Sequence, residues 1–180
     1  MGPVKKILIC AGIHGDEPQS NLATIKLIDF LRGKGINGTI YIIPFAMPCD
    51  TAKNSRYYEG TDPNRQAMRQ GSPVNKILNF ALSNDIDYLI DVHAGAGVGG
   101  KGLVFYQTKF EKSWANHVKM KTKCTIKSRP TKGTLRTTAS SRGINSITVE
   151  VDKKYNPART IKTEFELLKY SLEYLMVITV

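Results

Sequence analysis

Two of the three histidines in this sequence stand where a predicted strand ends, in the company of carboxylates. His14 precedes Glu17 by three residues on a turn that enters a helix, and His93 follows an apolar run that also contains Asp91. An imidazole and a carboxylate at this spacing can reach one cation at about 2.0 to 2.2 Å. Two histidines and one glutamate, with one position left open for water, form a recognised catalytic zinc set. His14, Glu17 and His93 therefore predict a site for one zinc ion (Zn2+).

Each of these residues also has an ordinary structural interpretation. His14 and Glu17 would suit the start of a helix, and His93 would suit a strand end where its ring is hydrogen-bonded. For any one of them alone, that interpretation is preferred. Their joint position favours the metal site, because ligands of open α/β sheets gather beyond the carboxyl ends of the strands.

The elements that must position these residues are predicted as strands alternating with helices. Short apolar or β-branched runs predict strands at 7–11, 39–43, 88–92, 103–108 and 146–151. Apolar residues at helical spacing predict helices at 18–31, 74–82, 111–121 and after Pro157. Residues 45–72 are predicted as a long loop of the kind that often carries function. The alternation is typical of an α/β fold, a three-layer sandwich around a mostly parallel mixed sheet.

Length and composition limit the class of protein. The 180 residues allow one domain, which we expect to span 1–180, and a hydrophobic content of 41% allows a buried core. Cys10, Cys49 and Cys124 are too few and too scattered for a disulfide framework or a Cys-only zinc site. No apolar run is long enough for a membrane span, and the first residues lack the apolar stretch of a signal peptide. We therefore expect a cytoplasmic protein, although a removed leader would leave no trace.

Four segments, taken together and in this order, resemble a known family of enzymes. They are His14-Gly15-Asp16-Glu17, then Asp62-Pro63-Asn64-Arg65 with Arg56 upstream, then Asp91-Val92-His93, and finally Gly133-Thr134-Leu135-Arg136 leading to Gly143-Ile144 and Ile147-Thr148-Val149-Glu150. The order resembles the zinc carboxypeptidase family, most closely its succinylglutamate desuccinylase/aspartoacylase branch. The resemblance spans residues 7–151 and implies the zinc carboxypeptidase-like version of the α/β sandwich.

The resemblance implies a division of chemical roles at the metal. His14, Glu17 and His93 would hold the zinc, and Glu150 would be the general base that takes a proton from the attacking water. Zinc lowers the pKa of its bound water to about 7, so a nearby carboxylate can deprotonate that water and later protonate the leaving amine. The ordinary alternative for Glu150 is a surface ion pair with Lys153 or Lys154, a common and weak interaction.

The resemblance also implies how a substrate is held. Asn64 and Arg65 would bind the free carboxylate of the substrate, since a guanidinium suits bidentate carboxylate binding better than an ammonium. Arg56 would face the scissile carbonyl and stabilise the developing oxyanion. Asp62 would orient His14 by accepting the N–H of its outer ring nitrogen. The alternative is that Arg56 and Arg65 are ordinary solvated loop residues.

Some positions depart from the family pattern. Residues 125–149 contain no tyrosine, although carboxypeptidases of this family carry a mobile tyrosine shortly before the catalytic glutamate. Pro63 and Ala94 stand where Leu and a polar residue are usual. Aspartoacylase-like enzymes carry a C-terminal β domain that narrows the cleft, whereas this sequence ends with its predicted last helix. An open cleft would suit a peptide, such as an anionic cell-wall peptide, better than a small acyl-amino acid.

Two other classes of function remain as alternatives. Residues 95–100 fit G-x-G-x-x-G, but a predicted strand follows them where a nucleotide-binding motif would open a helix. The formal net charge of +11 is concentrated between positions 112 and 149, which hold no Asp or Glu. Nine cations lie there, namely Lys112, Lys119, Lys121, Lys123, Lys127, Arg129, Lys132, Arg136 and Arg142. This segment fits a nucleic-acid-binding module, yet no recognisable nucleic-acid motif accompanies it, and attraction of an anionic substrate is favoured.

The sequence therefore predicts a zinc-dependent hydrolase that cleaves an amide bond next to a free carboxylate. Carboxypeptidase-like action on a small peptide is the preferred hypothesis. N-acyl-amino-acid deacylation is the second, because residues 133–150 resemble the deacylase branch best. A basic nucleic-acid-binding domain is the remote alternative.

Overall fold

A computed structural model describes residues 4–179, and its centre is a six-stranded mixed sheet. The strands are β1 (Lys6–Ala11), β2 (Thr39–Ile43), β3 (Tyr88–Gly95), β4 (Leu103–Tyr106), β5 (Thr125–Ser128) and β6 (Asn145–Asp152). They are arranged in the order β2-β1-β3-β6-β4-β5. The first four in this order are parallel, whereas β4 runs antiparallel to β6 and β5 runs parallel to β4.

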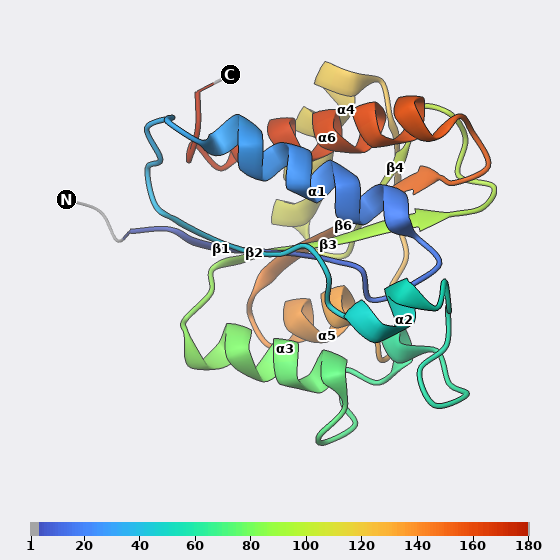
Figure 1. Ribbon diagram of the computed structural model, residues 1–180. Helices are drawn as coiled ribbons and strands as arrows, with labels where there is room; N and C mark the ends of the chain where they lie inside the picture. Colours follow the sequence, from blue (N-terminus) through green and yellow to red (C-terminus); the bar gives the residue numbers. More distant parts are fainter. Residues whose placement is uncertain (1–3, 180) are drawn as a thin grey trace.

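Helices cover both faces of this sheet (Figure 1). One face carries α1 (Pro18–Leu31), α4 (Lys109–Thr122) and α6 (Pro157–Tyr174), and the other carries α3 (Pro73–Ser83) and α5 (Leu135–Ser141). A short helix α2 (Pro48–Ala52) and a 3-10 turn η1 (Pro63–Arg65) lie in the long connection after β2. The expectation of a three-layer α/β sandwich with a mostly parallel mixed sheet is confirmed. Within residues 4–179, no helix combines the length and the apolar character that a membrane crossing requires.

Alternation along the central strands builds two apolar cores. In β1, Ile7 and Ile9 pack toward α1 and α6, while Leu8 and Cys10 pack toward α3 and α5. All four side chains are fully buried. A sheet buried on both faces explains why the central strands are almost continuously apolar rather than alternating with polar residues.

The sequence interpretation missed four elements. Strand β5 is an exposed edge strand rich in polar residues, and α5 is a seven-residue helix of mainly Thr and Ser. Neither carries a periodic apolar pattern, because β5 packs only through Ile126 and α5 through Leu135 and Ala139. The predicted loop at 45–72 contains α2 and η1, each too short for periodicity to reveal.

A buried carboxylate ties α4 to the sheet. Glu111 Oε2 accepts the backbone N–H groups of Gln107 and Thr108 at 2.7 and 2.9 Å, while its Oε1 accepts that of Ser146 on β6 at 2.8 Å. Thr108 completes a capping box by accepting the N–H of Glu111. One side chain therefore satisfies three backbone donors and fixes the start of α4 against β6.

A second buried carboxyl joins α6 to the first turn of α1. Ser20 donates to Glu164 Oε1 at 3.1 Å, and both side chains are fully buried. Burial raises the pKa of Glu164 well above its ordinary value, with the charges of Glu17 and Glu150 adding to the shift and Ser20 and His93 opposing it. Folding therefore favours the neutral, protonated form of Glu164.

This raised pKa predicts a pH-dependent stability. A group whose pKa is raised by folding contributes its full stability below its ordinary pKa, and that stability is lost as the pH rises toward the folded value. We expect Glu164→Gln, which cannot ionise, to match the wild type near pH 5 and to have the higher urea midpoint at pH 8.5. The control is Glu166→Gln, which changes a partly exposed side chain on the same helix. Equal loss of midpoint with pH in wild type and Glu164→Gln would contradict the prediction.

Candidate metal centre and substrate cleft

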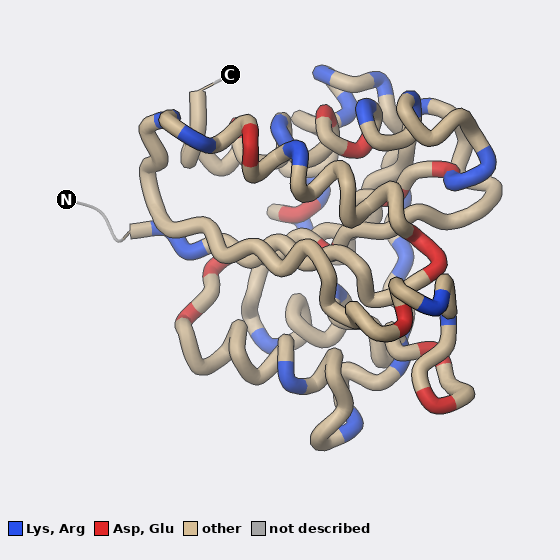
Figure 2. Tube along the Cα trace, viewed as in Figure 1, with Lys and Arg blue, Asp and Glu red and all other residues tan. Residues whose placement is uncertain are grey.

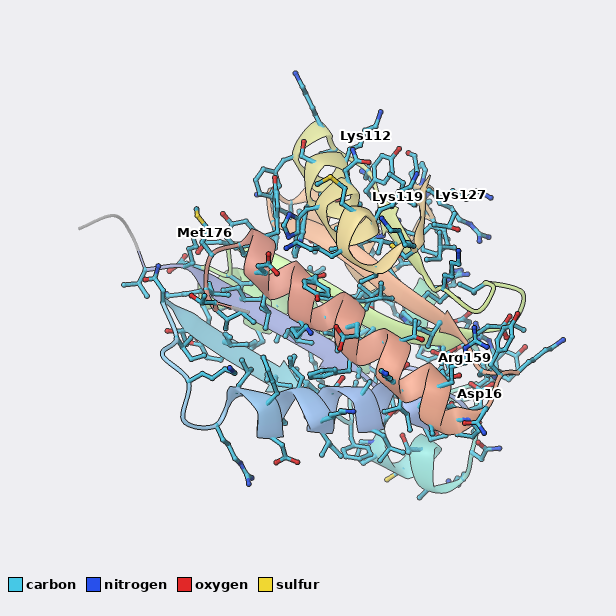
Figure 3. All side chains as sticks on the ribbon, turned by 90° about the horizontal axis from the view of Figure 1, so that it is seen from above. Asp16, Lys112, Lys119, Lys127, Arg159 and Met176 are labelled. Atoms are coloured by element: carbon cyan, nitrogen blue, oxygen red, sulfur yellow. The ribbon has the colours of Figure 1, made fainter. Side chains whose placement is uncertain are left out.

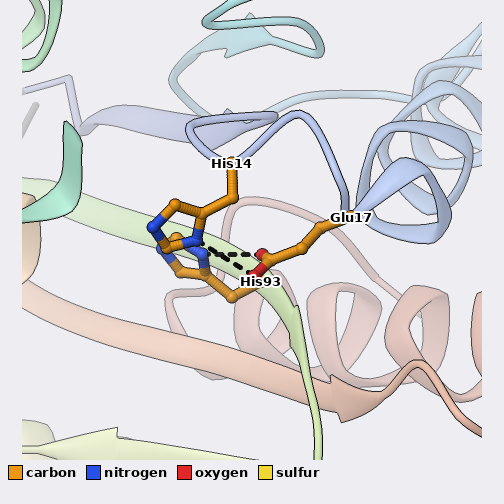
Figure 4. A group of neighbouring side chains, drawn as sticks. All are labelled: His14, Glu17 and His93. Carbon is orange, nitrogen blue, oxygen red and sulfur yellow. Dashed lines mark hydrogen bonds and ion pairs between the residues drawn. The ribbon is translucent and has the colours of Figure 1, made fainter. Parts of the chain in front are cut away.

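The three predicted metal-binding residues come together at the carboxyl ends of two neighbouring strands. His14 and Glu17 lie on the turn between β1 and α1, and His93 lies near the end of β3. Glu17 Oε1 lies 3.0 Å from His14 Nδ1, and Glu17 Oε2 lies 2.9 Å from His93 Nδ1 (Figure 4). One donor atom from each residue lies within 4.8 Å of the other two, and all three side chains are buried. This group could bind a metal ion.

The outer nitrogens of both imidazoles are held by further carboxylates. His14 Nε2 lies 2.9 Å from Asp62 Oδ1, and His93 Nε2 lies 3.0 Å from Asp91 Oδ1. Each ring therefore presents its Nδ1 to Glu17 and its Nε2 to a second carboxylate. The orienting role of Asp62 stays a prediction. Carboxylates that accept the outer N–H of a histidine are the usual support of metal-binding histidines. By this donor set, the residues present fit a zinc-type divalent cation.

The electrostatics of the group are those of a cation site. Burial alone would raise the pKa of Glu17, but the two imidazoles lower it, so the carboxyl is ionised. Burial raises the pKa of Asp62 as well, yet His14 and the nearby arginines lower it to about 2. For His93, burial opposes protonation, but Asp91 and Glu17 raise its pKa well above the ordinary value. Three carboxylates thus surround two imidazoles, an arrangement that attracts positive charge.

Glu150 faces the same cleft from β6. It is in register with His93 on the adjacent strand, so both side chains extend from the same face of the sheet. Burial raises the pKa of Glu150; Glu17 adds to the shift and His93 opposes it. Among the described residues, Glu150 forms no ion pair with Lys153 or Lys154, so this ordinary role is not seen. Lys153 pairs with Asp16 instead.

Arg56 and Arg65 lie at the rim of this cleft. Arg56 Nη1 donates to Glu17 Oε1 at 3.1 Å, and its Nη2 lies 3.6 Å from Asp62 Oδ2. Arg65 Nη1 donates to the carbonyl of Asn64 at 2.6 Å. The side chains are 36% and 47% exposed, respectively. Both guanidinium groups thus line the cleft and remain accessible to an anion in it.

The side chain of Asn64 is bonded within the protein rather than open to a substrate. This side chain is buried. Its Nδ2 donates to Asp91 Oδ2 at 3.3 Å and lies 2.8 Å from His93 Nε2. Its Oδ1 accepts the N–H of Leu135, the first residue of α5. Both ends of the amide are thus engaged inside the protein, where they connect α5 to His93. Substrate contact by Asn64 stays a prediction.

The cleft continues beyond the metal group along β6 and β4. This part is lined by Phe105, Arg129, Thr131, Thr134, Arg136, Thr148 and Lys153. Sequence reasoning gave no site role to Arg136, Lys153 or Asp91. The spacing of Asp91 and His93, two residues apart on one strand, is a signal that could have placed them on one face. No tyrosine from residues 4–179 lines the cleft.

Solved structures with this fold include two bacterial proteins. Csd4 from Helicobacter pylori, described as a cell shape determinant and as a D,L-carboxypeptidase, matches with a TM-score of 0.82 and 19% identity over 97% of this chain and 51% of its own. An aspartoacylase family protein from Mesorhizobium loti matches with a TM-score of 0.79 and 16% identity over 99% and 60%. The chain therefore spans about half the length of Csd4.

Sequence comparison identifies the family directly. No curated protein matches the sequence. The model of the succinylglutamate desuccinylase/aspartoacylase catalytic domain matches residues 3–174, nearly the whole chain. With His14, Glu17, His93 and Glu150 gathered in one cleft, the chain belongs to the succinylglutamate desuccinylase/aspartoacylase catalytic domain family.

Proposed function

We propose that residues 1–180 form a single catalytic domain, a zinc-dependent hydrolase that cleaves an amide bond next to a free carboxylate. One observation carries the proposal: two imidazole Nδ1 atoms converge on Glu17 in a cleft that also holds Glu150 and two accessible arginines. The family membership and the description of Csd4 as a D,L-carboxypeptidase support a hydrolase of this kind.

The proposed reaction divides the work between an ion and the protein. Held by His14, Glu17 and His93, a zinc ion would supply a Lewis acid and lower the pKa of water to about 7. Glu150 accepts a proton from the attacking water and delivers it to the nitrogen of the leaving amine. Burial raises the pKa of Glu150, which makes it a stronger base toward water. A catalytic group that both takes and returns a proton works best when its pKa lies nearer the operating pH.

The arginines bind and stabilise negative charge. Arg56 sits beside Glu17 and, turned toward the cleft, donates to the oxygen of the scissile carbonyl as charge develops on it. Arg65 pairs with the terminal carboxylate of the substrate through two parallel N–H groups. Both roles need guanidinium groups that the protein has not already buried, and these two are accessible.

The preferred substrate is a small peptide, with an anionic cell-wall peptide as the specific candidate. Csd4 has been solved with a bound tripeptide and with mDAP, a finding about that protein that supports peptides here by analogy. The cleft also extends past Glu150 to Arg129 and Thr148, which gives room for more than one residue. N-acyl-amino-acid deacylation is the second candidate, and the name of the matching family favours it. Assay of a tripeptide beside an N-acyl-amino acid separates the two.

Removal of metal ligands provides the first test. We expect purified wild type to bind about one zinc ion per chain, and His14→Ala and His93→Ala to lose that ion and the activity. A chelator should abolish amide hydrolysis in the wild type, and added zinc should restore it. The matched control is His117→Ala, which changes the half-buried histidine beside Glu173, outside the cleft. Stoichiometric zinc in either of the first two variants, by metal analysis, would rule out the ligand set.

Substitution of the base provides the second test. Glu150→Gln keeps the shape of the side chain but cannot accept the proton, so kcat should fall by about 10² to 10⁴-fold. Zinc content and melting temperature should stay close to those of wild type, because Glu150 is not among the proposed ligands. Glu166→Gln on α6 is the control and should retain full activity. Unchanged turnover in Glu150→Gln would remove the base from the proposal.

The third test concerns carboxylate recognition. Arg65→Lys keeps the charge but loses the bidentate geometry, so KM for a peptide with a free C-terminus should rise about tenfold or more, the equivalent of ~1.5 kcal/mol. The same peptide with a C-terminal amide should be a poor substrate for wild type and insensitive to the substitution. Arg69→Lys, four residues further on and outside the cleft, is the control. Equal effects on both peptides would contradict the role of Arg65.

A further inference from the structure

The glycine-rich segment between β3 and β4 is held by one carboxylate of the protein itself. Asp152 Oδ2 accepts the consecutive backbone N–H groups of Gly97, Val98 and Gly99 at 3.0, 3.1 and 3.3 Å. Gly97 and Gly99 have φ of +78° and +85°, a backbone conformation that glycine adopts at little cost. Successive N–H groups that converge in this way form a cradle for an anion. Here the anion in the cradle is the carboxylate of Asp152 itself.

Asp152 is placed so that this cradle lies beside Glu150. It is the last residue of β6, two positions after Glu150, and it is in register with Gly95 at the end of β3. Its other oxygen, Oδ1, accepts the N–H of Lys154 at 3.0 Å, so four backbone donors converge on one side chain. These backbone hydrogen bonds, that of Lys154 first, lower the pKa of Asp152 and keep it ionised.

Gly95, at the start of the same segment, packs against the Glu150 carboxylate. A Cβ atom added to Gly95 would overlap Glu150 Oε1, so the carboxylate lies directly against the backbone there. The carbonyl of Gly95 in turn accepts the N–H of Lys153 at 2.9 Å. Movement of residues 95–99 would therefore change the space in which the Glu150 side chain is confined.

We propose that Asp152 is a positioning residue for Glu150: by holding residues 97–99 through their N–H groups, it keeps Gly95 against the Glu150 carboxylate and the carboxylate directed into the cleft. This inference rests on the proposed function, in which Glu150 is the base. It also explains why the G-x-G-x-x-G pattern needs no nucleotide, since the three N–H groups of residues 97–99 are bound by the protein itself. A displacement of about 1 Å in a reacting group can reduce a rate by about 10²-fold. Movement of residues 95–99 away from Glu150 should therefore have a measurable effect on kcat.

The test compares two substitutions at one position. Asp152→Ala removes every acceptor, and we expect kcat for peptide hydrolysis to fall about 10- to 100-fold with KM changed less than about twofold. Amide hydrogen exchange at residues 96–100 should become faster in the same variant. Asp152→Asn retains one oxygen that can accept the three N–H groups, so it should recover most of the kcat and of the exchange protection. If Asp152 contributed only to stability, Asp152→Ala would lower the melting temperature while the kcat of the folded enzyme stayed at the wild-type value, and the positioning role would be wrong.

Glu111→Gln is the matched control for this test. Glu111 also accepts three backbone N–H groups, but it contacts Ser146, toward the opposite end of β6 from Asp152. The control variant should lose stability and keep the kcat of the wild type. If Asp152→Ala does not fold, Asp152→Ser, whose hydroxyl is too short to reach all three donors, takes its place.

The outcomes separate this inference from the proposed function. Full turnover in Glu150→Gln would remove the base from the proposed function, and the positioning role of Asp152 with it. Loss of turnover in Glu150→Gln together with wild-type kcat in Asp152→Ala would overturn only the positioning role. Unchanged hydrogen exchange at residues 96–100 in Asp152→Ala would also overturn it, since the segment would then be held without the carboxylate.

Discussion

The carboxylate of Glu17 is the group on which the rest of the site depends. Its two oxygens contact the Nδ1 atoms of His14 and His93, which come from segments almost 80 residues apart. The same carboxylate accepts the backbone N–H of Ala94 at 3.0 Å, so it also fixes the end of β3. A buried charge is tolerated only where partners satisfy it. Asp62 and Asp91 contact the far side of the two imidazoles, and Arg56 contacts Glu17 from the rim.

Sheet topology then places the second carboxylate. Parallel pairing of β3 with β6 puts Glu150 in register with His93, although the two are far apart in the sequence. A slip of one residue would turn Glu150 to the opposite face, into the core beneath α6. The extended pairing of β3 and β6, eight residues in register from Tyr88 with Asn145 to Gly95 with Asp152, protects against such a slip. The buried clamp of Glu111 on Ser146 adds a further restraint at the start of β6.

The sequence allowed prediction of the parts of the site that depend on strand ends. His14, Glu17, His93 and Glu150 each follow or end a strongly apolar run, so the direction of a parallel sheet was enough to group them. Contacts made by short or irregular segments could not be foreseen in this way. The engagement of Asn64 with Leu135 depends on α5, a helix whose Thr- and Ser-rich residues carry no periodic signal. Asp152 likewise looks in sequence like an ordinary residue at a strand end, because its partners are backbone N–H groups.

The positions of the charged residues explain how a protein with a net charge of +11 can also contain a group of carboxylates. Glu17 and Asp91 line the cleft and are buried. The positions of Lys and Arg are spread along the chain over both helical layers (Figure 2). Lys112, Lys119 and Lys127 extend outward along α4 and β5 (Figure 3), and no acidic group from residues 4–179 lies within 4.0 Å of them. Exposed charges of one sign increase the encounter rate with anions over about a Debye length, roughly 8 to 10 Å. The buried carboxylate of Glu17 is instead compensated by the imidazoles and by Arg56, which contact it. The proposed function needs both signs of charge, carboxylates to hold a cation and surface cations to attract an anionic substrate, and the structure keeps the two groups in different places.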